Sequence, residues 1–255
     1  MRIVVIGATG MVGTQLTSEA TRRGHDVVAV SRSPGRTRTR SPRTTTDDDA
    51  RRGTPVRTVA LDVSRPGAAD AVLAGADAAI LAARAPSGAE RRIGPLTTTV
   101  LDAARRTDTR LLVVGGAGPL SSPGRADPAP GDAEAVPTEG CPAPGDGGLL
   151  VVDDPRFVPP SWRAVAAASL DQLAACVVHP YEGWTYLSPP AVLAPGERSG
   201  RYRRGTTTLL TDPDGRSSIS VEDLAVAAID EVEVPGTDRH ITVARSHTEH
   251  PRIDR

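Results

Sequence analysis

Short apolar runs alternate along the chain with longer stretches of helical periodicity. The runs are almost continuously apolar, as in parallel strands covered on both faces, and they lie at residues 3–6, 27–30, 58–61, 78–82 and 111–114. Between them, apolar residues at helical spacing predict helices at about 11–23, 68–73 and 97–106. This succession predicts an α/β fold with a doubly wound parallel sheet and helices on both of its faces.

The C-terminal part continues with more varied signals. A helix is predicted at about 162–176 with Ser161 as its cap, and a strand at 184–187. The turn Pro213-Asp214-Gly215 lies between two short β-prone runs and predicts a hairpin of strands 207–211 and 217–220. Ser220-x-x-Asp223 is an acidic version of a capping box, and it predicts a helix to about residue 232. A closing strand is expected at 239–244.

Two low-complexity stretches interrupt the pattern. Residues 32–52 contain seven arginines, five threonines and three consecutive aspartates, and residues 119–148 contain seven prolines and six glycines. Neither can bury enough apolar area to form part of a core, so loops are predicted at about 33–55 and 119–148. A basic nucleic-acid arm and a hinged lid are the respective alternatives. We expect a single domain over residues 1–255, with a small C-terminal substrate-side region at about 156–220.

Charge and composition exclude several classes of protein. The 30 basic and 31 acidic residues give a net charge of −1, and aromatic residues are only 2% of the chain, so neither nucleic acid nor a membrane surface is an expected partner. Two cysteines without metal-ligand spacing indicate a reducing, cytoplasmic environment and no metal site. Every basic residue other than histidine is arginine. The missing lysine excludes Schiff-base chemistry, a P-loop lysine and a lysine general acid.

The most specific motif opens the chain. It is a G-x-x-G-x-x-G run between the first predicted strand and helix, with the sequence Gly7, Ala8, Thr9, Gly10, Met11, Val12 and Gly13. Such glycines permit a tight turn, a close approach of the backbone to a pyrophosphate, and close packing of helix on strand. The helix N-terminus then presents free N–H groups to the phosphates. These residues predict a dinucleotide cofactor.

The end of the second strand indicates which dinucleotide. NAD-specific sites place Asp or Glu there to bind the ribose 2′-hydroxyl, but this chain has Ser31 and Arg32. A guanidinium can bind a 2′-phosphate through charge-assisted hydrogen bonds, which favours NADP(H) over NAD(H). Asp62 and Val63 follow the third strand and are expected at the adenine edge, although Asp62 is also a candidate helix cap.

The chain resembles the atypical short-chain dehydrogenase/reductase superfamily, and within it the NAD(P)H-binding group that includes NmrA-like proteins and flavin reductases of the biliverdin-reductase-B type. The matching segments are GATGMVG, Ser31-Arg32, Leu61-Asp62-Val63, Leu81-Ala82-Ala83, Val113-Val114-Gly115-Gly116-Ala117-Gly118, Trp184-Thr185-Tyr186-Leu187-Ser188-Pro189-Pro190 and Ile219-Ser220-Val221-Glu222-Asp223-Leu224-Ala225. The resemblance implies a Rossmann-type fold. It also implies cofactor contacts from Ala82, Ala83, Gly115, Gly116 and Pro189.

A catalytic set does not follow from this resemblance. The Tyr-x-x-x-Lys pair of most short-chain dehydrogenases is impossible without lysine. The flavin-reductase relatives carry a Ser after the fifth strand and a His after the Pro-Pro pair, where this chain has Gly115–Gly118 and Ala191. Hydride transfer to a flavin-like, quinone-like or other small conjugated acceptor needs no such donor. The alternatives are a non-catalytic, NADP(H)-sensing regulator of the NmrA-like kind and an epimerase or dehydratase.

A small molecule is the expected partner, and five residues are candidates for its site. Trp162 and Tyr202 could form an aromatic wall, and Pro190, Glu197 and Arg201 lie in or near the loop where the superfamily builds its substrate pocket. Core packing or a solvated loop is the alternative for each of them. His179 is a candidate general acid, and an ordinary loop histidine is its simpler interpretation.

Overall fold

A computed structural model describes residues 1–33, 56–86, 88–124 and 148–246. Its main element is an eight-stranded sheet with the order β3-β2-β1-β4-β5-β6-β10-β8. The strands, in sheet order, are Arg57–Ala60, Asp26–Ser31, Arg2–Ile6, Ala78–Leu81, Arg110–Val114, Trp184–Ser188, His240–Arg245 and Tyr202–Gly205. All neighbours pair in parallel except β8, which pairs antiparallel with β10. The predicted doubly wound fold is confirmed.

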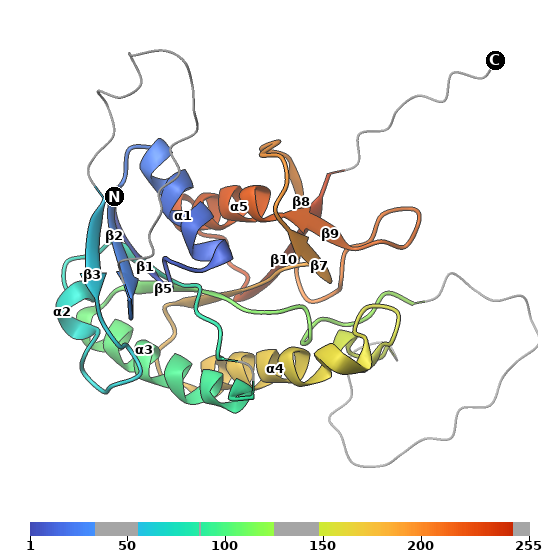
Figure 1. Cartoon of the computed structure of the whole chain (residues 1–255), viewed down its shortest axis with the longest axis horizontal. Helices are drawn as coiled ribbons and strands as arrows, with labels where there is room; N and C mark the ends of the chain where they lie inside the picture. Colours follow the sequence, from blue (N-terminus) through green and yellow to red (C-terminus); the bar gives the residue numbers. More distant parts are fainter. Residues whose placement is uncertain (34–55, 87, 125–147, 247–255) are drawn as a thin grey trace, which may run out of the picture.

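Helices cover both faces of the sheet, as Figure 1 shows. One face carries α1 (Met11–Arg22) and α5 (Val221–Glu233), and the other carries α2 (Asp70–Leu73), α3 (Ile93–Thr107) and α4 (Arg163–Val178). Each layer has its own buried core: the residues of α1 and α5 pack on one side of the strands, and those of α3 and α4 on the other. The strand order reverses direction at β1 and β4, where ligands of such sheets bind.

Most predicted elements are confirmed to within a few residues, and β3 corrects one interpretation. This strand is at the edge of the sheet and three of its four residues are exposed, so it is not covered on both faces like the central strands. Gly24 ends α1 with φ +81°, the left-handed conformation that favours glycine after a helix. None of the helices in the described segments is long and apolar enough to cross a membrane.

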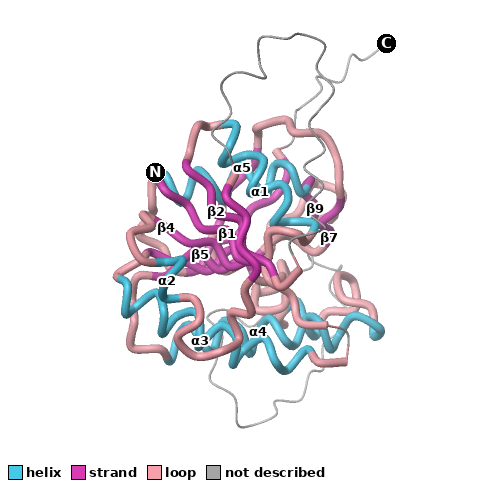
Figure 2. Tube along the Cα trace, turned by 60° about the vertical axis from the view of Figure 1, so that its left-hand side comes forward, coloured by secondary structure: helices cyan, strands magenta, loops and turns pink. Residues whose placement is uncertain are grey.

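The predicted hairpin is wrong. The turn itself forms, with the Gly215 N–H donating to the Asp212 carbonyl at 2.9 Å. However, only β9 (Ser218–Ser220) is a strand, and it pairs in parallel with β7 (Val192–Ala194). β9 pairs with β7, in the loop after β6, and not with residues 207–211. Figure 2 shows β7 and β9 side by side, apart from the main sheet. A short local sequence carries no signal of that distant partner.

The predicted helix caps have different outcomes. The Ser220 hydroxyl accepts from the Asp223 N–H at 3.0 Å, as expected. The Asp223 carboxylate accepts instead from Gly200 N–H and Ser199 Oγ, so α5 also anchors the preceding loop. Ser161 does not cap α4, because a 3₁₀ turn at Pro160–Trp162 leads directly into that helix.

The two predicted low-complexity loops lie largely outside the described residues. Residues 119–124 and 148 are described, and they belong to the fold. Leu120 packs fully buried with Val151 and Leu209 in a third small core, and Ser121 forms isolated bridges with Leu150 and Thr208. The second stretch therefore follows β5, as predicted, and its first residues support the substrate-side region. Further 3₁₀ turns lie at Glu90–Arg92 and Val151–Asp153.

Candidate functional site

The glycine turn after β1 is fixed by the chain's own packing at two positions. Gly7 has φ +87°, and a Cβ there would lie 2.6 Å from the Ala82 carbonyl oxygen at the end of β4. A Cβ on Gly13 would lie 2.1 Å from the carbonyl oxygen of Gly7. Both distances are impossible for real atoms. The first glycine therefore lets the turn pass β4, and the third lets α1 pack on the turn.

Gly10 is different, because the protein itself hardly restricts it. Its φ of −75° suits any residue, and the nearest atom to an added Cβ would be Gly7 O at 3.3 Å. Gly10 is the N-cap of α1, and no side chain caps this helix. The first N–H groups of α1 thus face a space that a Cβ at position 10 would narrow. This geometry fits a phosphate bound at the helix N-terminus.

The residues predicted to read the adenosine half have three different environments. Ser31 is buried, and its Oγ has no hydrogen-bond partner in the described part of the chain. Arg32 is exposed at the end of β2. Asp62 accepts hydrogen bonds from Ser64 Oγ at 2.7 Å and Ser64 N–H at 3.2 Å. These bonds lower the pKa of Asp62, with smaller contributions from Arg65 and Arg32.

Asp62 does not cap a helix, because α2 begins at Asp70 without a side-chain cap, and its carboxylate instead closes a local turn with Ser64, near Arg32. Val63 is only 6% exposed and packs into the core. It supports the strand end below a nucleotide rather than presenting a side chain to one.

A cavity of about 690 Å³ lies at the carboxyl ends of the central strands. Among the predicted residues, those that line it are Met11, Val12, Ala82, Ala83, Gly115, Gly116, Trp162, Pro189 and Pro190. They come from the ends of β4, β5 and β6, from the start of α1 and from the 3₁₀ turn before α4. The cavity is therefore continuous from the N-terminus of α1 to the aromatic residues that precede α4.

The glycine-rich segment after β5 admits the helix that forms one wall. A Cβ on Gly115 would lie 1.9 Å from the Tyr186 hydroxyl oxygen, and one on Gly118 would lie 2.3 Å from the Ala166 carbonyl oxygen. A Cβ on Gly116 would lie 3.0 Å from the Cβ of Ser169. Gly115 and Gly116 line the cavity, as predicted for cofactor contact. Their lack of side chains is also what permits α4 to pack closely on the end of β5.

Helix α4 turns polar side chains toward the protein. It is rich in alanine, yet its buried residues are Ser169, Gln172 and Cys176. Ser169 Oγ donates to the Ala166 carbonyl at 2.6 Å. Tyr186 Oη donates to the Ser169 carbonyl at 2.9 Å and contacts Gln172 Oε1 at 3.4 Å. Ser169 and Gln172 both line the cavity. Sequence reasoning missed them, although two polar residues three positions apart in an alanine-rich helix were an available signal.

Arg156 is a second residue that sequence reasoning missed. Its guanidinium binds the buried Asp154 carboxylate at 2.6–3.0 Å and also donates to Ser122 Oγ at 3.0 Å. The same group lies 5.2 Å from the centre of the Phe157 ring. Hydrogen bonds from Arg156 hold the pKa of Asp154 well below its ordinary value. Arg156 and Phe157 line the cavity beside Trp162, so an aromatic wall is present, but with Phe157 in place of Tyr202.

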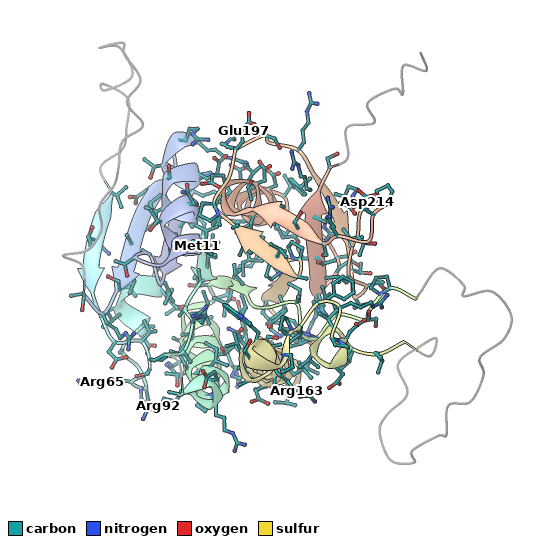
Figure 3. All side chains as sticks on the ribbon, turned by 45° about the vertical axis from the view of Figure 1, so that its right-hand side comes forward. Met11, Arg65, Arg92, Arg163, Glu197 and Asp214 are labelled. Carbon is teal, nitrogen blue, oxygen red and sulfur yellow. The ribbon has the colours of Figure 1, made fainter. Side chains whose placement is uncertain are left out.

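Three of the predicted substrate residues lie outside this cavity lining. Tyr202 Oη donates to Asp230 at 2.6 Å, on the face of the sheet covered by α5. Glu197 and Arg201 lie in the exposed loop that Asp223 anchors, and Figure 3 shows Glu197 beyond α5 and far from the α4 residue Arg163. The segment after Pro190 lines the cavity as far as Leu193, and the loop that contains Glu197 and Arg201 then runs to α5. Substrate contact by these three residues stays a prediction without geometric support.

None of the histidines in the described segments lines the cavity either. His179 lies 3.3 Å from Asp102 and accepts from the Tyr181 N–H, at the other end of α4. His240 is bonded to Ser188 at 2.9 Å, and burial lowers its pKa to about 4. Among the described residues, no group of three His, Cys, Asp or Glu side chains could hold a metal ion.

Similarity to known proteins identifies the family of this chain. Residues 7–136 match the model of the NAD(P)H-binding family. The chain belongs to this family. Its first glycine turn and the cavity-lining segments after β4 and β5 fall within the matched residues, whereas the end of β6 lies beyond them. A nicotinamide nucleotide is therefore its cofactor class.

The relatives extend the match to nearly the whole chain. Uncharacterized protein YwnB of Bacillus subtilis (strain 168) is 30% identical over 239 residues, which are 92% of this chain and 93% of that one. Among solved structures, a “putative exported protein” of Burkholderia pseudomallei is 33% identical, covers 96% and 99% of the two chains and superposes with a TM-score of 0.71. A “putative epimerase” of Bacteroides thetaiotaomicron is 30% identical, covers 98% and 99%, and has a TM-score of 0.73.

Proposed function

We propose that this protein is an NADPH-dependent reductase of a planar, conjugated acceptor of the flavin or quinone class. The observation that carries the proposal is the single cavity that joins the N-terminus of α1 to an aromatic wall. A cofactor that begins on the glycine turn and a flat acceptor that lies against Phe157 and Trp162 would share it.

The residues present fit a dinucleotide. Gly10 and the uncapped start of α1 would hold the pyrophosphate, and Met11, Ala82 and Ala83 would follow it across the strand ends toward Gly115 and Pro189. When bound, the nicotinamide supplies a hydride. What the protein contributes is orientation and the exclusion of water from a largely apolar slot.

The acceptor class follows from what the cavity wall offers. No His, Tyr or Cys side chain belongs to the part of the wall formed by described residues, and the chain has no lysine. Reduction of a simple ketone needs a proton donor positioned at the carbonyl oxygen. A conjugated acceptor spreads the incoming charge over its ring and can take its proton from water, so it suits this wall better.

NADPH is the proposed form of the cofactor because of the end of β2. Arg32 is exposed there, and the carboxylate of Asp62 is already committed to Ser64. Among the described residues no carboxylate is bonded to the Arg32 guanidinium, and a guanidinium there favours a ribose 2′-phosphate over a 2′-hydroxyl.

Two measurements test this proposal. Titration calorimetry with NADPH and NADH gives both affinities, and loss of nicotinamide absorbance with flavin mononucleotide and a quinone panel gives turnover. Arg32→Ala should weaken NADPH at least about tenfold, the equivalent of about 1.4 kcal/mol, and leave NADH within about twofold. Arg65→Ala, a neighbouring arginine beside Asp62, is the matched control. Equal losses for both nucleotides would refute the 2′-phosphate contact, and the absence of any nucleotide binding would refute the whole proposal.

A non-catalytic sensor of NADP(H) is the second candidate, and the lack of a His, Tyr or Cys side chain in the described wall favours it. Tight NADPH binding without turnover of any acceptor is the result that it requires. An epimerase, the activity in the name of the Bacteroides relative, is less well supported. Such enzymes of this superfamily use the Tyr/Lys pair that this chain lacks, and neither Tyr186 nor Tyr202 reaches the cavity wall.

A further inference from the structure

The inward face of α4 contains a polar group that the fold does not use. Gln172 is 3% exposed and belongs to the cavity wall. Its amide nitrogen Nε2 has no hydrogen-bond partner anywhere in the described residues. An unpaired buried amide group costs about 1–3 kcal/mol. Since leucine or methionine at this helical position would avoid that cost, the amide points to a ligand that pairs with it.

The surroundings fix which end of the carboxamide is free. Tyr186 Oη lies 3.4 Å from Gln172 Oε1 and donates to the Ser169 carbonyl at 2.9 Å. Burial raises the pKa of Tyr186, so the hydroxyl keeps its proton and remains a donor. The single Tyr186 proton is directed mainly at the Ser169 carbonyl and only weakly at Gln172 Oε1, and Nε2 is the end of the carboxamide without a partner among the described residues. The Ser169 hydroxyl is bonded within its own helix, to the Ala166 carbonyl at 2.6 Å.

The free group has a definite chemistry. It is a neutral donor, so it selects a hydrogen-bond acceptor and gives little preference to a full negative charge. Three charged groups also line the cavity: Arg84 is exposed in the loop after β4, the Glu90 carboxylate accepts from the Gly88 N–H at 2.8 Å, and Arg156 is bonded to Asp154 in the segment before α4. The wall also contains Ser169, Gly116 and the apolar Ile93, and Gly116 lies against Ser169.

We propose that the Gln172 carboxamide binds a ring carbonyl oxygen of the acceptor, and so selects conjugated carbonyl compounds over flat hydrocarbons of the same shape. This inference rests on the proposed function, because it names the group by which that acceptor is recognised. The flat faces of Phe157 and Trp162 hold the ring, and the single donor of Gln172 sets which edge of the ring points toward the end of β5.

The test uses binding, which is independent of turnover. Two probes differ only in their carbonyl groups: 2,3-dimethyl-1,4-naphthoquinone and 2,3-dimethylnaphthalene, whose blocked ring positions prevent reaction with cysteine. Equilibrium dialysis with the full-length protein and excess NADP⁺ measures both affinities. The wild type should prefer the quinone by about five- to tenfold, the range of about one neutral hydrogen bond. In Gln172→Met the preference should fall to about onefold.

Two further variants separate recognition from structure. Gln172→Glu keeps an oxygen toward Tyr186 but removes the donor, and it should also lose the preference for the quinone. Gln15→Met is the matched control, the same substitution at the only other glutamine of the chain, on α1 and outside the cavity wall. It should keep the wild-type preference.

Several outcomes would overturn the inference. They are equal wild-type affinities for the two probes, binding of neither probe, or an unchanged preference in Gln172→Met. Weaker NADP⁺ binding in that variant with an unchanged probe preference would likewise overturn it, and would assign the amide to the cofactor. Failure of the proposed function has a different signature, namely no NADPH binding or no reduction of any acceptor by the wild type.

Discussion

At the scale of single residues, the three glycines of the first turn have separable roles. Gly13 is required by the fold, since a Cβ there would overlap the Gly7 carbonyl at 2.1 Å. Gly10 has only a 3.3 Å neighbour and an ordinary φ. The sequence motif treats these positions alike, but the structure distinguishes a residue that serves packing from one that leaves room for a ligand.

This difference gives a paired prediction. Gly13→Ala should lower the free energy of unfolding by about 2 kcal/mol or more, in the range of overpacked cores. Gly10→Ala should change it by less than about 1 kcal/mol, because its backbone conformation suits alanine, yet reduce NADPH affinity at least about tenfold. Urea unfolding and calorimetry measure the two quantities. A Gly10→Ala protein that binds NADPH normally would contradict the assigned role of this position.

The part of the cavity wall formed by the glycine turn and the strand ends was predictable at residue scale, and the part formed by α4 and Arg156 was not. The glycine turn and the strand ends are contiguous in sequence with elements that periodicity reveals, so Met11, Val12, Ala82 and Gly116 were found. Gln172 and Arg156 reach the cavity through the packing of α4 and its preceding loop, which no local pattern encodes. Tyr202 was chosen because it is aromatic, but the antiparallel pairing of β8 carries it to the other face.

At the scale of elements, a buried carboxylate joins three separate segments. Glu19 on α1 is 3% exposed in its side chain and accepts from Arg22, Arg23 and Arg198. Arg23 in turn binds Asp230 and Glu233 on α5. Burial alone would raise the pKa of Glu19, but hydrogen bonds from Arg198 and Arg23 outweigh it and lower the pKa to about 2.

Removal of this charge should be costly. Glu19→Gln leaves the guanidinium groups around it without their counter-charge, so the free energy of unfolding should fall by about 3 kcal/mol. Asp153→Asn is a suitable control because its pair with Arg163 is exposed, and it should cost less than about 1 kcal/mol. Urea unfolding at pH 7 compares them. Similar losses in both variants would show that the network adds nothing beyond a surface pair.

The elements themselves were predicted unevenly, for physical reasons. The central strands and α1, α3 and α5 have clear hydrophobic patterns, because each buries a defined apolar face, whereas α4 is alanine-rich and buries Ser169, Gln172 and Cys176. β7, β8 and β9 have three or four residues each, and their partners are distant in sequence. Their existence depends on tertiary pairing, so β7 and β8 were missed and β9 was given the wrong partner.

At the scale of the whole molecule, one buried histidine couples folding to pH. His240 begins β10, bonds Ser188 at 2.9 Å, and packs edge-on to the Tyr186 ring at 5.4 Å. Burial lowers its pKa from the ordinary 6.5 to about 4. His240 therefore becomes protonated near pH 6.5 in the unfolded chain, but only near pH 4 in the folded protein. Stability is complete above pH 6.5 and falls as the pH drops through that interval.

The loss from pH 7.5 to pH 5 should be on the order of 1–2 kcal/mol. His240→Gln, whose amide can replace the ring nitrogen toward Ser188, should reduce this loss to a small remainder. Glu19 does not obscure the comparison, since its pKa of about 2 places its own loss of stabilisation below pH 4.5. Urea unfolding curves at the two pH values give the result. An equally steep pH dependence in the variant would exclude His240 as its source.

The packing of α1 against α5 has a consequence for how the protein is made. The first helix of the nucleotide turn shares its core with the last helix of the chain, and Figure 1 shows them adjacent on one face of the sheet. Residues 7–136, which match the family model, therefore do not include α5, the helix against which α1 packs. Residues up to Glu233 must be synthesised before α1 can bury its apolar face against α5. A product truncated before α5 would contain the whole glycine motif but would lack the helix that supports α1.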